Sequence, residues 1–164
     1  MITLRQATVA DLPAINDIYN HFILHSAITF DVKPWDMSRR TDWFNQMQQN
    51  GQYTVLVALK DNLVIGFAYN SAYNPKAAFC LSTEVTIYKA PECTIKGVGR
   101  ALYKRLLAEL KARDYHRAYA LITVPNEASN KLHQQLGFTQ VGLMSQVGEK
   151  MGKFHDVALY EKAL

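Results

Sequence analysis

The residues with the clearest chemical potential lie at 96–100, where the sequence reads Lys-Gly-Val-Gly-Arg before a long helix-like stretch. Glycine weakens helices, so Gly97 and Gly99 at a helix entrance indicate that something approaches the backbone closely there. The free N–H groups at the start of a helix bind phosphate, and Lys96 and Arg100 add positive charge. The segment therefore predicts a phosphate site, with a plain turn before a helix as the alternative interpretation.

Two glycine-rich nucleotide motifs do not fit this segment. The P-loop requires the string G-x-x-x-x-G-K-[ST], which the sequence does not contain. The dinucleotide motif G-x-G-x-x-G requires a third glycine where Leu102 stands, and leucine is too large for the close strand packing that the glycine allows. What remains is a helix N-terminus that offers backbone donors to an anion.

Other residues with reactive side chains give weaker indications. Glu84 lies in the middle of a predicted strand, where a carboxylate is unusual. His21 and His25 have the i, i+4 spacing of metal ligands, but the sequence places no third ligand near them, so we expect no metal. Cys80 and Cys93 lack metal-type spacing, and we expect idle thiols rather than a disulfide or a nucleophile.

The composition is that of an ordinary globular protein. The chain has 164 residues, 49% of them hydrophobic and 20% charged, which fits a single domain over residues 1–164. The net charge of +4 gathers in the basic stretch 96–117, which favours an anionic ligand. No apolar run is long enough to span a bilayer, and the first residues lack the layout of a secretory signal, so we expect a cytoplasmic protein without a membrane partner. Nucleic acid is not expected as a partner, because the sequence contains no helix-turn-helix, zinc or single-strand-binding motif.

Hydrophobic periodicity predicts an α/β fold. Strands are expected at 2–6, 53–59, 63–69, 79–88, 118–124, 138–147 and 154–160, and helices at 12–22, 38–49, from the glycine pair to 113, and at 126–136. Thr8 and Asp11 resemble a helix capping box, Asn50-Gly51 is a typical helix stop, and Asp61-Asn62 predicts a hairpin turn. The order β-α-α-β-β-β-α-β-α-β-β indicates a mixed sheet with helices on both faces.

The strand, turn and helix around the glycine pair resemble the GCN5-related N-acetyltransferase (GNAT) family. That family's diphosphate loop is written Q/R-x-x-G-x-G/A, and it aligns with Thr-Ile-Lys-Gly-Val-Gly at 94–99. The segment VPNEASNKLHQQLGF at 124–138 resembles the family's later helix, which begins with asparagine. Ile-Tyr-Asn at 18–20 and QVGEKMGKFHDVAL at 146–159 are similar to the phosphinothricin and methionine sulfoximine acetyltransferase subgroup. The resemblance covers nearly the whole chain.

The resemblance implies a GNAT-type, mostly antiparallel sheet and acetyl-CoA as the co-substrate. In the family a gap opens beside the strand that here reaches residue 88, and the pantetheine arm lies in it like an added strand. Backbone groups of Thr86, Ile87 and Tyr88 are expected to bind this arm and to polarise the thioester carbonyl. Asn126 and Ser129 are expected on its other side, and Asn126 also fits a simple helix cap. The diphosphate is expected at the loop formed by Thr94, Ile95, Lys96, Gly97, Val98, Gly99 and Arg100.

This loop departs from the family pattern at two positions. Thr94 replaces the leading Gln or Arg, and Ile95 replaces a glycine that is usual there. The backbone donors survive this change, whereas a side-chain contact to the diphosphate is lost. Lys96 and Arg100 are the residues that could replace it.

Acetyl transfer to an amine requires a neutral amine and a proton for the leaving thiolate. The resemblance places the base at Glu84, acting through water, and the alternative is a glutamate held in a salt bridge in a polar pocket. His133 stands where many family members have a tyrosine as the general acid. It is expected either to protonate the thiolate or to cap the pocket as a half-buried histidine. Tyr88 is the weaker candidate for the acid.

The resemblance also indicates where the acceptor binds. Its pocket is expected to include Thr29, Phe30, Tyr73, Asn74 and Thr83. The subgroup often has an arginine at the position of Asn74, which suits a carboxylate, so a small amine with a different charge fits this chain equally well.

We therefore expect direct transfer, in a ternary complex, to the primary amine of a small molecule, an amino acid or analogue, by a homodimer like those of the subgroup. Two alternatives stay open: a protein N-terminal or lysine acetyltransferase, and a CoA-binding module without turnover.

Overall fold

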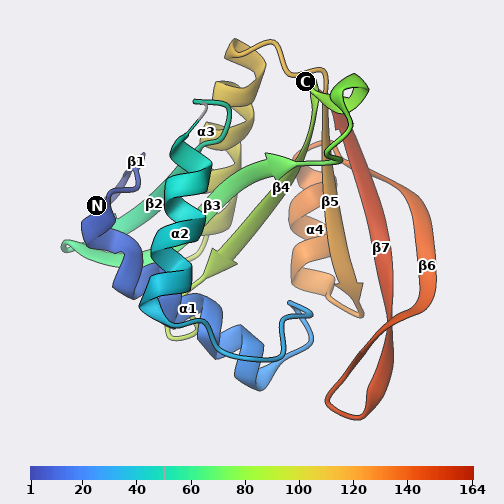
Figure 1. The fold of residues 1–164 in the computed structure, drawn as a ribbon, viewed down its shortest axis with the longest axis horizontal. Coiled ribbons are helices and arrows are strands. Elements are labelled where there is room, and N and C mark those ends of the chain that lie inside the picture. Colours follow the sequence, from blue (N-terminus) through green and yellow to red (C-terminus); the bar gives the residue numbers. More distant parts are fainter. Residues whose placement is uncertain (50) are drawn as a thin grey trace.

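Seven strands form one twisted sheet in the computed structural model, which describes residues 1–49 and 51–164 (Figure 1). The strands are β1 (Ile2–Gln6), β2 (Val55–Lys60), β3 (Leu63–Ala72), β4 (Ser82–Lys89), β5 (Arg117–Val124), β6 (Thr139–Lys150) and β7 (Lys153–Ala163). Their order in the sheet is β1-β2-β3-β4-β5-β7-β6. All neighbours are antiparallel except β4 and β5, which are parallel. The predicted mixed, mostly antiparallel sheet is confirmed.

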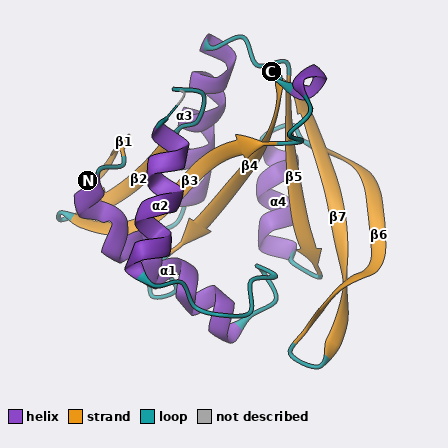
Figure 2. Cartoon of the chain, in the orientation of Figure 1, coloured by secondary structure: helices purple, strands orange, loops and turns teal. Residues whose placement is uncertain are grey.

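In the described part of the chain, four helices cover the two faces of this sheet (Figures 1 and 2). They are α1 (Leu12–His25), α2 (Met37–Gln48), α3 (Val98–Ala112) and α4 (Glu127–Gln135), with short 3-10 helices at Val9–Asp11 and Ala77–Phe79. Figure 1 shows α1 and α2 in front of the sheet and α3 and α4 behind it. None of the helices in the described part of the chain is long and apolar enough to cross a membrane.

Three local features predicted from the sequence are present in the structure. The buried stripe of α3 runs through Val98, Leu102, Leu106 and Leu110, all of them fully buried. Thr8 and Asp11 form the predicted capping box, in which the Thr8 N–H donates to Asp11 Oδ2 at 2.7 Å. Asp61 and Asn62 both have positive φ, 51° and 66°, as a two-residue hairpin turn requires. Of the predicted stop at Asn50-Gly51, Asn50 lies outside the described residues.

The predicted strand at 79–88 begins too early. β4 starts at Ser82, and the preceding segment forms a 3-10 turn instead. Asn74 Oδ1 accepts the Lys76 N–H at 3.0 Å, and the Phe79 N–H donates to the Lys76 carbonyl, also at 3.0 Å. These local hydrogen bonds satisfy the backbone there, so no strand ladder forms before Ser82.

The strands β4 and β5 pair over only a short stretch. Their register joins 82–84 to 117–119, although β4 continues to Lys89 and β5 to Val124. Beyond Glu84 the two strands diverge, and Figure 1 shows the opening between them. The backbone edge of β4 over 86–88 is thus unpaired on the side of β5, where an extended ligand could lie as an added strand.

Candidate active site

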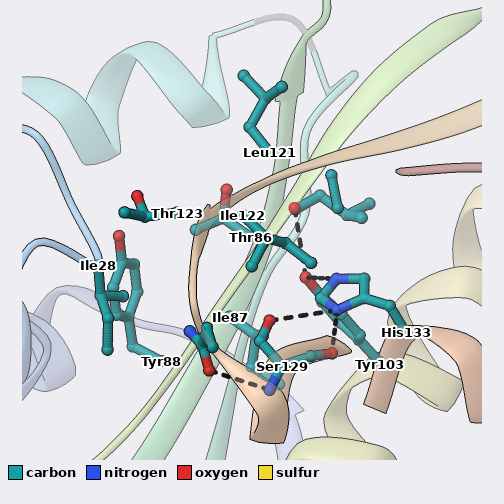
Figure 3. A pocket seen from close by; sticks show the side chains of 13 residues that line it. Ile28, Thr86, Ile87, Tyr88, Tyr103, Leu121, Ile122, Thr123, Ser129 and His133 are labelled. Atoms are coloured by element: carbon teal, nitrogen blue, oxygen red, sulfur yellow. Dashed lines mark hydrogen bonds between the residues drawn. The ribbon is translucent and has the colours of Figure 1, made fainter. Parts of the chain in front are cut away.

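Three adjoining hollows meet where β4 and β5 diverge. One lies in the gap itself, a second runs toward the N-termini of α3 and α4, and a third opens on the face that carries α1 and α2. Ile28 and Tyr88 line all three hollows, so they mark the junction (Figure 3). A ligand that enters from one face can therefore meet a ligand that enters from the other.

The hollow behind the sheet is built at two helix N-termini. It is lined by Lys89 at the end of β4 and by 90–91 after it, by Gly99 in the first turn of α3, and by Asn126, Ala128 and Ser129 at the start of α4. Phe22 of α1 and Ile28 in the loop after α1 also line it. The first N–H groups of each helix have no acceptor within the helix, and the helix dipole makes this end positive. An anionic group fits such a place. We name this hollow the cofactor groove.

The two glycines at the start of α3 serve different purposes. Gly97, the N-cap residue, has φ +84°, a left-handed conformation that side chains disfavour, and a Cβ there would meet nothing within 4 Å. A Cβ on Gly99 would lie 3.3 Å from Leu132 Cδ2 and 3.5 Å from Ile87 Cδ1. Gly97 thus sets the turn, and Gly99 lets α3 approach α4 and β4.

The remaining residues of the predicted diphosphate loop divide into exposed and packed side chains. Thr94, Lys96 and Arg100 are exposed, Ile95 is partly buried, and Val98 is buried in the core. At Val98, only the backbone is therefore available to contact a ligand. Lys96 and Arg100 keep their side chains free to reach an anion beside the turn.

Glu84 lies on the opposite face, in the hollow under the loop between α1 and α2, which we name the acceptor hollow. Its side chain is partly buried beside Tyr69 and Thr86, and burial raises the pKa of the Glu84 carboxyl. Among the ion pairs of the described residues, none includes Glu84. A carboxylate with a raised pKa in a hollow is suited to accept a proton near neutral pH.

His133 is more deeply buried than the sequence indicated, with 2% of its surface exposed. Its Nδ1 lies 2.7 Å from the Ser129 carbonyl oxygen, which can only accept, so the proton sits on Nδ1. Nε2 then faces the Tyr103 hydroxyl at 3.3 Å (Figure 3). Burial lowers the pKa of the His133 imidazole, so the ring is neutral at pH 7.

Tyr103 is a functional candidate that the sequence analysis missed. Its ring is buried, and its hydroxyl lies in the hollow of the gap, 3.3 Å from both His133 Nε2 and the Val85 carbonyl oxygen. Burial raises the pKa of the Tyr103 hydroxyl, so it holds its proton at neutral pH. The available signal was a tyrosine on the apolar face of α3, next to Leu102.

The residues expected along the pantetheine arm line the gap. Thr86, Ile87 and Tyr88 come from β4, and Asn126 and Ser129 come from the start of α4. The simple cap predicted for Asn126 is present, because its Oδ1 accepts the Ser129 N–H at 3.1 Å. The cap fixes this side chain at the wall of the hollow.

The residues expected around the acceptor are only partly brought together. Thr29 and Phe30 line the acceptor hollow with Glu84. Tyr73 lies nearby, since its ring stacks on Tyr119 at 4.4 Å, and Tyr119 pairs with Glu84 across the two strands.

Two of these residues lie elsewhere. Thr83 is fully buried in the sheet, where its hydroxyl donates to the Ser71 carbonyl at 2.7 Å. Asn74 lines a separate hollow beside Tyr115.

Neither the histidine pair nor either cysteine lines the three adjoining hollows. The rings of His21 and His25 are 4.8 Å apart on α1. Within the described residues, no group of three or more His, Cys, Asp or Glu side chains could hold a metal ion. Cys80 is exposed and Cys93 is buried, and both are free thiols.

Comparison with known proteins agrees with this geometry. The model of the acetyltransferase (GNAT) family matches residues 16–138. A phosphinothricin N-acetyltransferase from Streptomyces coelicolor is 39% identical over 165 residues, which cover 99% of this chain and 96% of that protein. An L-methionine sulfoximine/L-methionine sulfone acetyltransferase from Salmonella typhimurium is 36% identical over 163 residues, covering 99% and 95%.

A solved structure extends the likeness to the cofactor. A GNAT superfamily phosphinothricin acetyltransferase from Sinorhizobium meliloti, in complex with AcCoA, matches with a TM-score of 0.95 at 35% identity. The match covers 99% of this chain and 88% of that chain. This chain therefore belongs to the GNAT family and is an acetyl-CoA-dependent N-acetyltransferase, close to the phosphinothricin and methionine sulfoximine acetyltransferases.

Proposed function

We propose that the protein transfers an acetyl group from acetyl-CoA to the primary amine of a small molecule by direct attack in a ternary complex. Amino acids and their analogues are the first class to test, because relatives are named for phosphinothricin and methionine sulfoximine. One observation carries the proposal: the gap between β4 and β5 joins the cofactor groove on one face to Glu84 on the other. Both substrates can then be bound together.

The residues present fit acetyl-CoA. The turn over 96–99 offers backbone donors to a diphosphate, with Lys96 and Arg100 beside it. The unpaired edge of β4 over 86–88 offers amide groups to the pantetheine arm. Acetyl-CoA, when bound, supplies the thioester whose carbonyl carbon the amine attacks. A main-chain N–H of this edge would stabilise the negative charge that develops on the carbonyl oxygen.

Glu84 is the group that prepares the acceptor. An amine arrives mostly protonated at pH 7, so it must lose a proton before it can attack. In its carboxylate form Glu84 takes this proton, directly or through one water molecule. The hydroxyls of Thr86 and Tyr69 line the same hollow and can hold that water.

Tyr103 and His133 form the pair that serves the leaving group. When the carbon–sulfur bond breaks, the sulfur leaves as a thiolate and takes up a proton. The Tyr103 hydroxyl carries a proton in the gap, and the neutral His133 can orient this hydroxyl through Nε2. We assign the proton donor to Tyr103 and give His133, predicted as the acid, a positioning role.

The shape of the acceptor hollow supports a small acceptor over a peptide. The Lys150 ammonium donates to the Thr29 carbonyl at 2.7 Å, and this contact ties the loop after α1 to the β6–β7 hairpin. Phe30 packs against the same hairpin: its ring is 6.1 Å from that of His155, and a Cβ on Gly148 would lie 2.5 Å from Phe30 Cε2. The loop after α1 and the β6–β7 hairpin therefore contact each other beside the hollow, which limits the room for a long acceptor.

A thiol-release assay tests this function. Free amines, amino acids and short peptides are offered with acetyl-CoA, and CoA release is followed. Turnover with small amines supports the proposal. Turnover with peptides alone would point to a protein acetyltransferase, and cofactor binding without turnover would point to a binding module.

Gly97→Ala tests the turn before α3. A residue with a side chain in the left-handed conformation costs about 1–2 kcal/mol of conformational free energy. The turn should therefore shift, and its N–H groups should no longer point at the diphosphate. We expect acetyl-CoA to bind about tenfold more weakly, as measured by calorimetry. Gly152→Ala is the matched control, because Gly152 has φ +71° with open space but lies in the β6–β7 hairpin. It should lose similar stability and keep its affinity. Equal affinity in both variants would contradict this role.

We also propose that the protein is a homodimer. β6 is an edge strand of the sheet, and Val141, Leu143 and Met144 on it are exposed by 40–52%. An apolar edge of this kind is normally covered by another surface. Sedimentation at micromolar concentration should give twice the chain mass of 18.6 kDa, and a sharp monomer boundary would contradict the proposal.

A further inference from the structure

The acceptor hollow has an aromatic and apolar wall. Three tyrosines, Tyr19, Tyr69 and Tyr88, form one side of it. Their rings belong to a packed cluster, in which Tyr88 lies 5.2 Å from Tyr19. The opposite side consists of apolar side chains from the loop, β5 and the hairpin: Ile28, Phe30, Leu121, Met144, Val147 and Val157.

The hollow offers a negative group and no positive one at its surface. Glu84 is its carboxylate, and no Lys or Arg is among the described residues that line it. An ammonium ion is favoured here, because it is attracted both by a carboxylate and by the faces of tyrosine rings. A carboxylate on the same acceptor has no cation to pair with, and burying an unpaired charge is costly.

The basic side chains near this wall lie outside the hollow. Lys150 is 6% exposed, and its ammonium is bound to the Thr29 carbonyl. Arg40 is 2% exposed and lies behind the wall, with its guanidinium carbon 4.9 Å from the Tyr19 ring centre and 4.2 Å from that of Trp35. Lys76, on the loop after β3, lines the separate hollow. None of the three side chains lines the acceptor hollow.

We infer that the preferred acceptor is a primary amine with an aromatic or branched apolar tail and without a carboxylate next to the nitrogen. This inference rests on the proposed acetyl transfer to small amines, and it narrows that class. The ammonium group would approach Glu84, and the tail would pack among Phe30, Leu121 and Val157. An α-amino acid would place its carboxylate in the same wall without a partner.

The test compares acceptors that differ only at this group. Phenethylamine, phenylalaninamide and phenylalanine share one ring, and 3-methylbutylamine and leucine form a second pair. We expect kcat/KM for each amine to exceed that of its amino acid by at least about tenfold, with the amide near the amine. The amide is the control for size, because it keeps the bulk of the carboxylate and removes its charge.

The outcomes separate the inference from the function on which it rests. Amino acids acetylated as well as, or better than, the matched amines would overturn the inference and leave the acetyltransferase intact. An amide as poor as the amino acid would also overturn it, because size and not charge would then decide. No turnover with any acceptor would overturn the proposed function itself.

A charge placed at the rim provides the second test. Val147 lines the hollow and is 54% exposed, so an arginine there can reach the bound acceptor. Val147→Arg should shift the ratio of phenylalanine to phenethylamine turnover upward by about tenfold relative to Val147→Met, which has a long uncharged side chain. An unchanged ratio in a folded arginine variant that still acetylates the amine would argue against charge as the cause.

Discussion

Replacing Glu84 with glutamine is expected to lower kcat/KM by about 10²- to 10⁴-fold while the affinity for acetyl-CoA is kept. Glutamine has nearly the same shape and cannot accept the proton of the ammonium group. Glu84 does not line the cofactor groove, so the contacts there are not affected. Steady-state kinetics and calorimetry with acetyl-CoA measure the two quantities.

The pH dependence gives an independent check of the same residue. Burial raises the pKa of Glu84, so activity should fall on the acid side at a higher pH than an ordinary carboxyl group would give. A raised folded-state pKa also means that the folded protein binds this proton more tightly than the unfolded chain. The ionised side chain therefore lowers the free energy of unfolding above the folded-state pKa. This destabilisation is lost as the pH falls through that pKa.

Two further measurements complete this prediction. Glu84→Gln should unfold no earlier than the parent protein at pH 7, so lost activity cannot be ascribed to lost folding. Glu161→Gln is the matched control, because Glu161 is half-buried on β7 and does not line the hollow. Near-normal turnover in Glu84→Gln would contradict the assignment of Glu84 as the base.

Tyr103→Phe is expected to lower kcat by about 10²-fold, with the KM for acetyl-CoA little changed. The variant removes one oxygen atom in the gap, so the leaving thiolate loses its proton donor while the ring still packs in the core. Tyr115→Phe is the control, since the Tyr115 hydroxyl donates to the Gln52 carbonyl at 2.9 Å, far from the gap. Full activity in Tyr103→Phe would contradict the assignment.

The same experiment distinguishes Tyr103 from His133. If His133 positions the hydroxyl through Nε2, a His133→Gln variant should lose less activity than Tyr103→Phe. If the imidazole itself is the acid, the order should be reversed, and the basic limb of the pH profile should move with the variant.

Much of the fold could be predicted because its signals are local. The stripe of α3 and the turn at Asp61-Asn62 depend on residues close together in the chain, and both are correct. The predicted strand start near Phe79 was wrong. Alternating side chains also fit a 3-10 turn, and here the Lys76 N–H donates to Asn74 Oδ1 just before that turn. Periodicity records which side chains alternate and does not record which hydrogen bonds the backbone makes.

The site depended on distant contacts that periodicity does not contain. That β4 and β5 part after Glu84 is a property of the sheet as a whole, and only the family resemblance indicated it. The burial of His133 and its approach to Tyr103 need α3 and α4 to pack behind the gap. The placement of Asn74 in a separate hollow follows from the same 3-10 turn.

The most direct test of the account is a crystal structure of the protein with acetyl-CoA. We expect the diphosphate at the amides of 96–99, the pantetheine arm along 86–88, and the thioester carbonyl about 3 Å from a main-chain N–H of that edge. The sulfur should face the Tyr103 hydroxyl, with the acetyl group turned toward Glu84. A cofactor bound outside the gap, or an arm on the far side of β5, would contradict the account.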